Sequence, residues 1–381
     1  MTPERIVVSG ATGLLGRRLV QTLLERRPEA HLVLLARESE GQTAVQRVES
    51  IVQEVCAPDQ QRAALARMEI FSADVSRERC GLAESEHLSV AGGATRVIHA
   101  AATVRFDHPI QEARRINVGG THNMLALAEE ACRRGSLKSF TYIGTAFVAG
   151  LRSGLVREDE LEAGQRFRNT YEQSKCEAEK LVRSRMPGLP AVIVRPSIIV
   201  GDSQTGMTTS FKAFYWPLRV YARGWWRTVP GFPDAILDIV PVDFVAEAVA
   251  HLAFDDRALG RSFHLCAGPG GSATIGEIAD LAAGFFGVRR PRFVNPTLFF
   301  ALLRPILLAT LWGRRRRILR TGRLYRSHFR IRSVFDTTQA DELLGPAGIR
   351  PPRVMHYLER LFRFCVESDW GSRPAAPDTA A

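Results

Sequence analysis

The clearest indication of the fold is the segment Arg5-Ile-Val-Val-Ser-Gly10-Ala-Thr-Gly13-Leu-Leu-Gly16. Five strand-like residues lead into three glycines, and an amphipathic stretch begins at once. In this context Gly10 permits a tight turn, Gly13 lets the backbone approach a pyrophosphate, and Gly16 allows close packing of helix on strand. The free N–H groups and positive dipole end of the helix attract phosphates. Glycines also occur in ordinary turns, but the strand–turn–helix order favours a dinucleotide site.

The same alternation continues outward from this motif for about 190 residues. Apolar, β-branched runs alternate with amphipathic stretches, as expected of parallel strands that are buried on both faces. The pattern predicts an α/β fold with a Rossmann-type doubly wound parallel sheet. The expected strands are Arg5–Ser9, Leu32–Ala36, Met68–Ser72, Arg96–His99, Ser139–Ile143 and Ala191–Arg195, and the expected helices include Leu14–Glu25, Gln111–Arg134 and Tyr171–Arg185.

The pattern changes after about Asp202, where short aromatic segments and Pro/Gly turns replace the regular alternation. We therefore expect residues 1–205 to form the dinucleotide-binding domain, with 236–255 returning to it. Residues 206–235 and 256–370 are expected to form a smaller, mostly helical C-terminal substrate lobe. Residues 371–381 are expected to be a disordered tail. Within the second half, a strand Asp238–Val242, a helix Phe244–Phe254 and a strand Ser262–Cys266 are predicted.

The end of the second strand indicates which dinucleotide is bound. NAD enzymes usually place an acidic residue there to hold the ribose hydroxyls, but this strand ends with Arg37. A planar guanidinium suits a 2′-phosphate, and Arg17 could assist it. The prediction is NADP(H). The alternative is a solvated Arg37 with Glu38 on the ribose.

Several motifs resemble those of extended short-chain dehydrogenases/reductases. They are Gly10–Gly16, Val97-Ile-His-Ala-Ala-Ala-Thr-Val-Arg-Phe106, Ile116-Asn-Val-Gly-Gly-Thr121, Tyr142-Ile-Gly-Thr-Ala-Phe-Val148, Asn169-Thr-Tyr-Glu-Gln-Ser-Lys175, Arg195-Pro-Ser-Ile-Ile-Val-Gly-Asp-Ser203 and Val240-Pro-Val-Asp243. Within that family the chain is most similar to the fatty acyl-CoA reductase and thioester reductase branch, also called male-sterility-type reductases. The resemblance covers roughly Arg5 to Val249, and a weaker similarity extends over Val334–Leu361.

The resemblance implies roles for individual residues. Asp74 would meet the adenine, Ala100 and Ala101 would line the cofactor cleft, Asn117 would order the active site, and Pro196 to Ile198 would lie near the nicotinamide amide. The expected cofactor-binding residues are Gly10, Thr12, Gly13, Leu14, Leu15, Gly16, Arg17, Arg37, Asp74, Val75, Ala100, Ala101, Asn117, Tyr171, Lys175, Pro196, Ser197 and Ile198.

Tyr171 and Lys175 stand four residues apart at the start of a predicted helix, so both project from one face. A carbonyl that accepts a hydride also needs a proton, and a free phenol with a pKa near 10 is a poor donor at neutral pH. A nearby ammonium and an oxidised nicotinamide would lower that pKa. We expect Tyr171 to act as general acid, Lys175 to bind the ribose, and Thr145 to hold the substrate oxygen. Tyr-x-x-x-Lys alone is common in helices, so the prediction depends on the whole set.

The distribution of charge indicates which kinds of partner the chain could bind. The net charge is +11, and nine arginines without an acidic residue lie between Gly313 and Arg332. The preceding stretch, Phe293–Trp312, is too interrupted to span a bilayer, so segment 293–332 is predicted either to lie at a membrane surface or to pack beside a pocket for coenzyme A or carrier phosphates. No nucleic-acid motif accompanies the arginines. The scattered cysteines and histidines predict no metal site, His99 is expected to be a packed, hydrogen-bonded residue, and no secretory signal is expected.

The sequence thus predicts a cytoplasmic enzyme, peripheral on the membrane if segment 293–332 binds lipid. The leading hypothesis is NADPH-dependent reduction of a long-chain fatty acyl thioester, bound to coenzyme A or a carrier, to the aldehyde or on to the alcohol. The alternative is a dehydrogenase of a lipid or sterol alcohol or ketone, similar to 3β-hydroxysteroid dehydrogenases. Sugar-nucleotide epimerisation and a non-catalytic redox sensor rank below these. The resemblance also implies a homodimer.

Overall fold

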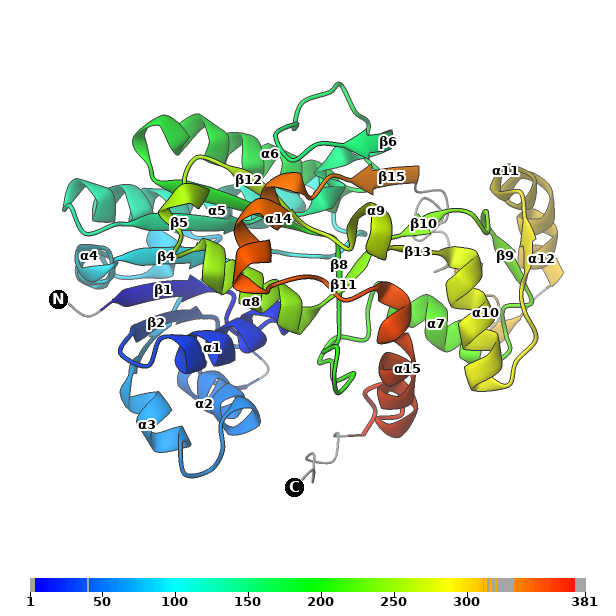
Figure 1. The fold of residues 1–381 in the computed structure, drawn as a ribbon, viewed down its shortest axis with the longest axis horizontal. Coiled ribbons are helices and arrows are strands. Elements are labelled where there is room, and N and C mark those ends of the chain that lie inside the picture. Colours follow the sequence, from blue (N-terminus) through cyan, green and yellow to red (C-terminus); the bar gives the residue numbers. More distant parts are fainter. Residues whose placement is uncertain are drawn as a thin grey trace.

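The computed structural model describes residues 4–39, 41–310, 312–313, 316, 319–320 and 332–373. Figure 1 shows a central sheet with helices on both faces and a smaller lobe beside it. Most of the arginine-rich segment between Gly313 and Arg332 and the tail residues 374–381 lie outside the described residues, so the expectations for them are untested.

The central sheet has seven parallel strands in the order β12-β7-β5-β4-β1-β2-β3. From β1 the chain moves outward to β2 and β3, then crosses to β4 on the other side of β1 and continues outward. This reversal between β1 and β4 is the place where doubly wound folds bind their ligands. The strands are β1 Arg5–Ser9, β2 His31–Ala36, β3 Met68–Ser72, β4 Arg96–His99, β5 Ser139–Ile143, β7 Ala191–Pro196 and β12 Ser262–Leu265.

The first strand shows why the sheet is covered on both faces. Successive side chains of a strand point to opposite faces. Ile6 and Val8 pack into one apolar cluster together with residues of α1 and α8, whereas Val7 packs into a second cluster with α4, α5 and α6. All three are fully buried. A continuous run of apolar residues in a strand is buried on both faces only when helices cover both sides of the sheet. The two layers of helices confirm the predicted doubly wound fold.

The helices agree with the prediction to within two residues wherever one was predicted. They are α1 Leu14–Arg26, α2 Ala44–Val55, α3 Gln61–Ala66, α4 Glu84–Gly93, α5 Ile110–Arg133, α6 Thr170–Arg185, α7 Tyr215–Ala222, α8 Val242–Leu252, α9 Gly268–Gly271, α10 Ile275–Phe286, α11 Pro296–Leu298, α12 Arg304–Thr310, α14 Thr338–Leu344 and α15 Leu358–Glu367.

The smaller lobe contains α7, α10, α11, α12 and short two-stranded ribbons (Figure 1). In this lobe β9 (Thr228–Pro230) pairs with β14 (Arg292–Val294), and β10 (Ile236–Leu237) pairs with β13 (Ala273–Thr274). The predicted strand Asp238–Val242 is shorter, β11 (Ile239–Pro241), and it pairs with β8 (Ile198–Val200) outside the main sheet. The apolar stretch Phe293–Trp312 is divided among β14, α11, a π-helical turn Phe299–Leu303 and α12. Among the described residues no helix is long and apolar enough to cross a bilayer.

Two segments that the sequence assigned to the second lobe pack on the first domain instead. β12 pairs with β7 at the sheet edge, and β15 (Arg332–Phe335) pairs with β6 (Ser153–Val156). The buried carboxylate of Glu158 accepts hydrogen bonds from the backbone N–H groups of His264 (2.8 Å) and Gln339 (2.6 Å). Ser262–Leu265 and Thr338–Leu344 therefore pack on the first domain and not in the second lobe. Local periodicity did not indicate these long-range contacts. The division between lobes otherwise stays a prediction.

Candidate active site

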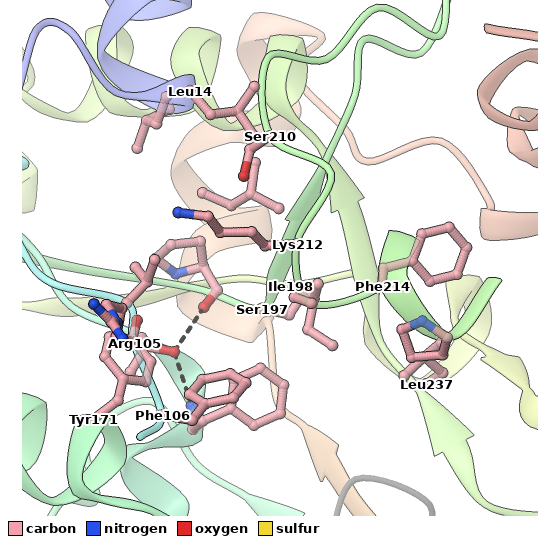
Figure 2. Close-up of a pocket in the computed structure, with 18 of the residues that line it drawn as sticks. Leu14, Arg105, Phe106, Tyr171, Ser197, Ile198, Ser210, Lys212, Phe214 and Leu237 are labelled. Atoms are coloured by element: carbon pink, nitrogen blue, oxygen red, sulfur yellow. Dashed lines mark hydrogen bonds between the residues drawn. The ribbon is translucent and has the colours of Figure 1, made fainter. Parts of the chain in front are cut away.

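A cavity of about 760 Å³ lies where the sheet meets the smaller lobe. Its walls include the glycine-rich turn after β1, residues after β4, β5 and β7, the start of α6, and residues of α7 and α10. Figure 2 shows Arg105, Phe106 and Tyr171 at one end, and Phe214 and Leu237 at the other. The cavity thus joins the topological switch point of the sheet to the interior of the second lobe.

The glycine-rich turn has the geometry that a pyrophosphate requires. Gly10 has φ +81°, and a Cβ there would lie 2.6 Å from the backbone nitrogen of Ala101. A Cβ on Gly16 would lie 2.0 Å from the carbonyl oxygen of Gly10. A Cβ on Gly13 would meet only that same oxygen, at 3.4 Å, so the space in front of Gly13 belongs to the cavity. The residues present therefore fit a dinucleotide whose phosphates lie over the N-terminus of α1.

Two arginines lie near the end of β2. Arg37 is exposed and lies outside the cavity wall, and Arg47, on α2, donates from Nη2 to the Thr12 hydroxyl (3.1 Å) and from Nη1 to the carbonyl oxygen of Arg37 (2.5 Å). Burial opposes ionisation of Asp74, but hydrogen bonds from Ser76 and the charge of Arg37 outweigh it and lower the pKa of the carboxyl. Arg17 lines the cavity and forms an ion pair with Glu54. Arg47 is not among the residues predicted from the sequence, because its ten-residue separation from Arg37 matches no known motif.

Tyr171, Thr145 and Lys175 lie at the end of the cavity next to β5. Tyr171 is the second residue of α6, which Asn169 caps by accepting the N–H of Glu172 at 2.9 Å. Its ring lies beside Phe106, with centroids 5.9 Å apart. Burial raises the pKa of Tyr171 to about 12, with hydrogen bonding to Thr145 acting in the opposite direction. The expected lowering of this pKa is therefore wrong for the side chains alone, because desolvation dominates, and the phenol is protonated at neutral pH.

Lys175 is 2% exposed. Its ammonium donates to the carbonyl oxygen of Ile143 (2.7 Å) and lies 4.3 Å from the ring centroid of Tyr142. Burial lowers the pKa of Lys175 to about 7, and the charge of Glu179 only partly offsets this effect. The ammonium of Lys175 therefore loses its proton easily. A negatively charged group or a hydrogen-bond acceptor in the cavity would favour the charged form.

Asn117 lies behind the cavity and connects three elements. Its amide nitrogen donates to the hydroxyl of Ser174 on α6 (2.9 Å) and to the carbonyl oxygen of Thr103 (3.3 Å), while its oxygen accepts the N–H of Thr103 (2.9 Å). The loop after β4 is thereby tied to the two helices α5 and α6. His99 is buried and bonded to the hydroxyls of Ser9 and Thr121, which confirms it as a packed residue. Burial lowers the pKa of His99 to about 3, so it is neutral.

The structure brings most of the predicted site residues to one cavity. Those that line it are Gly10, Thr12, Gly13, Leu14, Leu15, Gly16, Arg17, Ala100, Thr145, Tyr171, Lys175, Pro196, Ser197 and Ile198. Arg37, Asp74, Val75, Ala101 and Asn117 lie outside its wall. The walls that sequence reasoning missed are those of the second lobe, including Lys212, Phe214, Leu218, Trp226 and Ile278. No motif marks these residues, since only the folding of the lobe brings them together.

Comparison with known proteins identifies the family to which the chain belongs. The family model of the male sterility protein matches residues 8–249. The fatty acyl-CoA reductase wat of Drosophila melanogaster is 28% identical over 66% of this chain and 54% of its own, and the nonribosomal peptide synthetase asaC of Aspergillus flavus is 27% identical over 68% of this chain and 26% of its own. The terminal R domain of the myxalamid PKS-NRPS pathway superposes with a TM-score of 0.82 at 25% identity, over 98% of this chain and 93% of that domain. The chain thus spans about half or less of the curated relatives, but nearly all of the R domain.

Proposed function

Since the chain belongs to the male sterility protein family, we propose that it is an NADPH-dependent reductase of a long-chain fatty acyl thioester, bound to coenzyme A or to a carrier. The observation that carries the proposal is the cavity of about 760 Å³, which joins the glycine-rich turn for the dinucleotide, a protonated tyrosine and an apolar extension. The names of the relatives support the same chemistry, because they include a fatty acyl-CoA reductase and a synthetase reductase domain.

The chain's own residues would position the reacting carbonyl. A bound NADPH supplies the hydride. The hydroxyls of Thr145 and Tyr171 hold the thioester oxygen, and Tyr171 gives that oxygen its proton as the carbon–hydrogen bond forms. Loss of the thiol then leaves the aldehyde. Lys175, held by the carbonyl of Ile143, places a positive charge behind the tyrosine and favours the phenolate that the proton transfer creates. A second reduction to the alcohol would use the same residues.

The acyl chain would occupy the part of the cavity inside the second lobe. Its walls there are mostly apolar side chains from α7, α10, the paired strands β9 and β14, and the residues next to α7 and β9: Phe214, Leu218, Trp226, Val229, Ile278, Ala282 and Phe293. Each methylene removed from water contributes about 0.8 kcal/mol, so chain length should raise affinity until the cavity is filled.

The test follows NADPH absorbance with purified protein and a ladder of acyl-CoAs. Oxidation that increases with acyl length is the expected result. A protein that binds NADPH but oxidises it with no thioester would contradict the proposal. Activity on a panel of sterols and hydroxy-lipids would then favour the alternative, a lipid alcohol or ketone dehydrogenase.

The preference for NADPH over NADH is proposed to depend on Arg37 and Arg47. Both lie at the end of β2 where a 2′-phosphate would sit, and a guanidinium binds phosphate through paired N–H groups. We expect the double variant Arg37→Ala/Arg47→Ala to bind NADPH about 10- to 100-fold more weakly, since a hydrogen bond to a charged group contributes about 1.5–3 kcal/mol. The Kd for NADH, measured by fluorescence on the same variant, serves as the control and should change less than about threefold. Equal losses for both cofactors would contradict this assignment.

A peripheral membrane position is also proposed, from the surface of α11 to α12. Leu298, Leu302 and Ile306 are about one turn apart and are 58%, 61% and 60% exposed. Between Asp280 and Asp336 there are thirteen arginines and no acidic residue, whereas the rest of the chain has 38 basic and 40 acidic residues. Exposed apolar side chains that are followed in the sequence by a strongly basic segment are typical of a surface that binds anionic lipid. The homodimer stays a prediction.

Sedimentation with vesicles tests this surface. Wild-type protein is expected to bind vesicles that contain phosphatidylglycerol, and to bind pure phosphatidylcholine several-fold more weakly. The variant Leu302→Asp/Ile306→Asp should lose most of the binding, because it places two carboxylates among these exposed apolar side chains. Asp substitutions at Val45 and Leu88, exposed apolar residues of the first domain, are the matched control. Equal binding by both double variants would contradict the proposal.

A further inference from the structure

The loop between β8 and α7, residues 201–214, crosses from the sheet to the second lobe. It is anchored at both ends: the backbone N–H of Gly201 donates to the Tyr215 hydroxyl (2.7 Å), and the Ser203 hydroxyl donates to Asp243 (2.6 Å). Between these anchors the loop reaches the first turn of α1. Thr208 and Thr209 line a small pocket together with Leu14 and Arg17 of that turn. The loop therefore faces the helix end that would hold the cofactor phosphates.

Three polar side chains of this loop, Thr209, Ser210 and Lys212, line the main cavity. In Figure 2 the amine of Lys212 points into the cavity between Ser210 and Tyr171. Among the residues that the structure describes, no hydrogen bond or ion pair is made by the Lys212 ammonium or by the hydroxyls of Thr209 and Ser210.

The other charged residues of the cavity wall are all partnered. Arg17 pairs with Glu54, Arg105 with Asp107 (3.1 Å), Glu172 with Arg168 (3.4 Å), and Lys175 bonds a carbonyl oxygen. Lys212 thus adds an uncompensated positive charge to the described part of the cavity. It is also one of only four lysines in a chain with 51 lysines and arginines, so its presence is not a consequence of composition.

The backbone next to Lys212 is held in an unfavourable conformation. Ala213 has φ +43°, a region that residues with a Cβ seldom adopt. Such a conformation is unfavourable and persists only where the surrounding structure enforces it. Here the tight turn leads directly into α7 and leaves the lysine on the cavity side. Strain of this kind gathers at ligand-binding segments.

We propose that Thr209, Ser210 and Lys212 form a phosphate-binding site that faces the N-terminus of α1 across the cavity. An ammonium and two hydroxyls supply donors, and the helix end supplies backbone N–H groups from the other side. The carboxylates that line the two pockets are each paired with an arginine: Glu54 with Arg17, Asp202 with Arg18, Asp107 with Arg105 and Glu172 with Arg168. The site rests on the proposed function, because the phosphate comes either from the pyrophosphate of the cofactor or from coenzyme A or the phosphopantetheine arm of a carrier.

The test compares Lys212→Met with Lys180→Met. Both lysines are exposed, but Lys180 lies on α6, away from the cavity wall, and is paired with Glu162. The Kd for NADPH is measured by fluorescence and the Kd for coenzyme A by calorimetry. We expect Lys212→Met to raise one of the two values about tenfold, as loss of a charged hydrogen bond implies, and Lys180→Met to change neither. Lys212→Arg should retain most of the affinity. An effect on NADPH alone assigns the site to the cofactor, and an effect on coenzyme A alone assigns it to the substrate.

The outcomes separate this inference from the proposed function. Affinities of Lys212→Met within twofold of wild type for both ligands, with normal binding by the wild type, contradict the phosphate site alone. A wild-type protein that binds neither ligand contradicts both the site and the function. A tenfold loss in a protein that reduces no thioester supports the site and contradicts only the thioester reductase.

Discussion

Replacing Tyr171 with phenylalanine is expected to lower kcat for thioester reduction by about 10²- to 10⁴-fold, the range for loss of a positioned general acid. The substitution removes a single hydroxyl and keeps the ring that packs against Phe106. The phenol, whose pKa burial raises to about 12, is protonated at neutral pH and adjoins the hydroxyl of Thr145. Without it the developing oxygen charge keeps the Thr145 hydroxyl as a hydrogen-bond donor but loses its general acid.

Tyr221→Phe is the matched control for this prediction. Tyr221 also lines the cavity, but its hydroxyl lies in the second lobe and donates to the carbonyl oxygens of Ala279 (3.4 Å) and Arg289 (3.1 Å). Its loss should leave kcat within about threefold of wild type, since the lost bonds contribute only about 1 kcal/mol each to stability. The kcat of both variants is measured from the rate of NADPH absorbance loss at saturating substrate. If Tyr171→Phe keeps more than a tenth of the wild-type kcat, Tyr171 is not the proton donor.

Replacing Arg195 with methionine is expected to cost about 3–5 kcal/mol of unfolding free energy, the usual result of breaking a buried ion pair from one side. Arg195 on β7 is fully buried and donates to both carboxylate oxygens of Glu179 on α6 (2.9 and 2.5 Å). It also donates to the carbonyl oxygens of Glu158 (3.1 Å) and Glu160 (2.8 Å). Methionine fills much of the volume but satisfies none of these four acceptors.

The control for this effect is Arg183→Met. Arg183 donates to the same carboxylate (3.0 Å), but its side chain is 29% exposed and water can replace it. We expect this change to cost less than half as much. Urea unfolding followed by tryptophan fluorescence gives both values. The double variant Arg195→Met/Glu179→Leu should recover part of the loss, because it removes the stranded charge. A loss below about 1 kcal/mol for Arg195→Met would show that the network contributes little to stability.

This network links stability to the site. Glu179 lies one helical turn after Lys175, and Arg195 directly precedes Pro196 in the cavity wall. Local substitution at Arg195 should therefore also disturb catalysis, whereas the effect of Tyr171→Phe should be confined to catalysis. Melting curves of Tyr171→Phe close to wild type are part of that expectation.

Local sequence patterns were enough to predict the secondary structure of the first domain and its glycine-rich cofactor motif. The six predicted strands and three predicted helices appear within two residues of their expected bounds, because their periodicity and β-branched composition are local properties. The glycine motif and the Tyr171–Lys175 pair also depend on short spacings, and the structure places them in one cavity. These features need no knowledge of distant contacts.

The remaining features depend on the tertiary structure. It placed β12 in the main sheet through pairing with β7, and it brought Arg47 to the end of β2. It also assembled the apolar walls and Lys212 from segments separated by up to 80 residues. Such contacts depend on how whole elements pack, and packing leaves no periodic signal in the residues that it brings together. For this reason the sequence indicated the reaction, while the surroundings of the substrate became visible only in the fold.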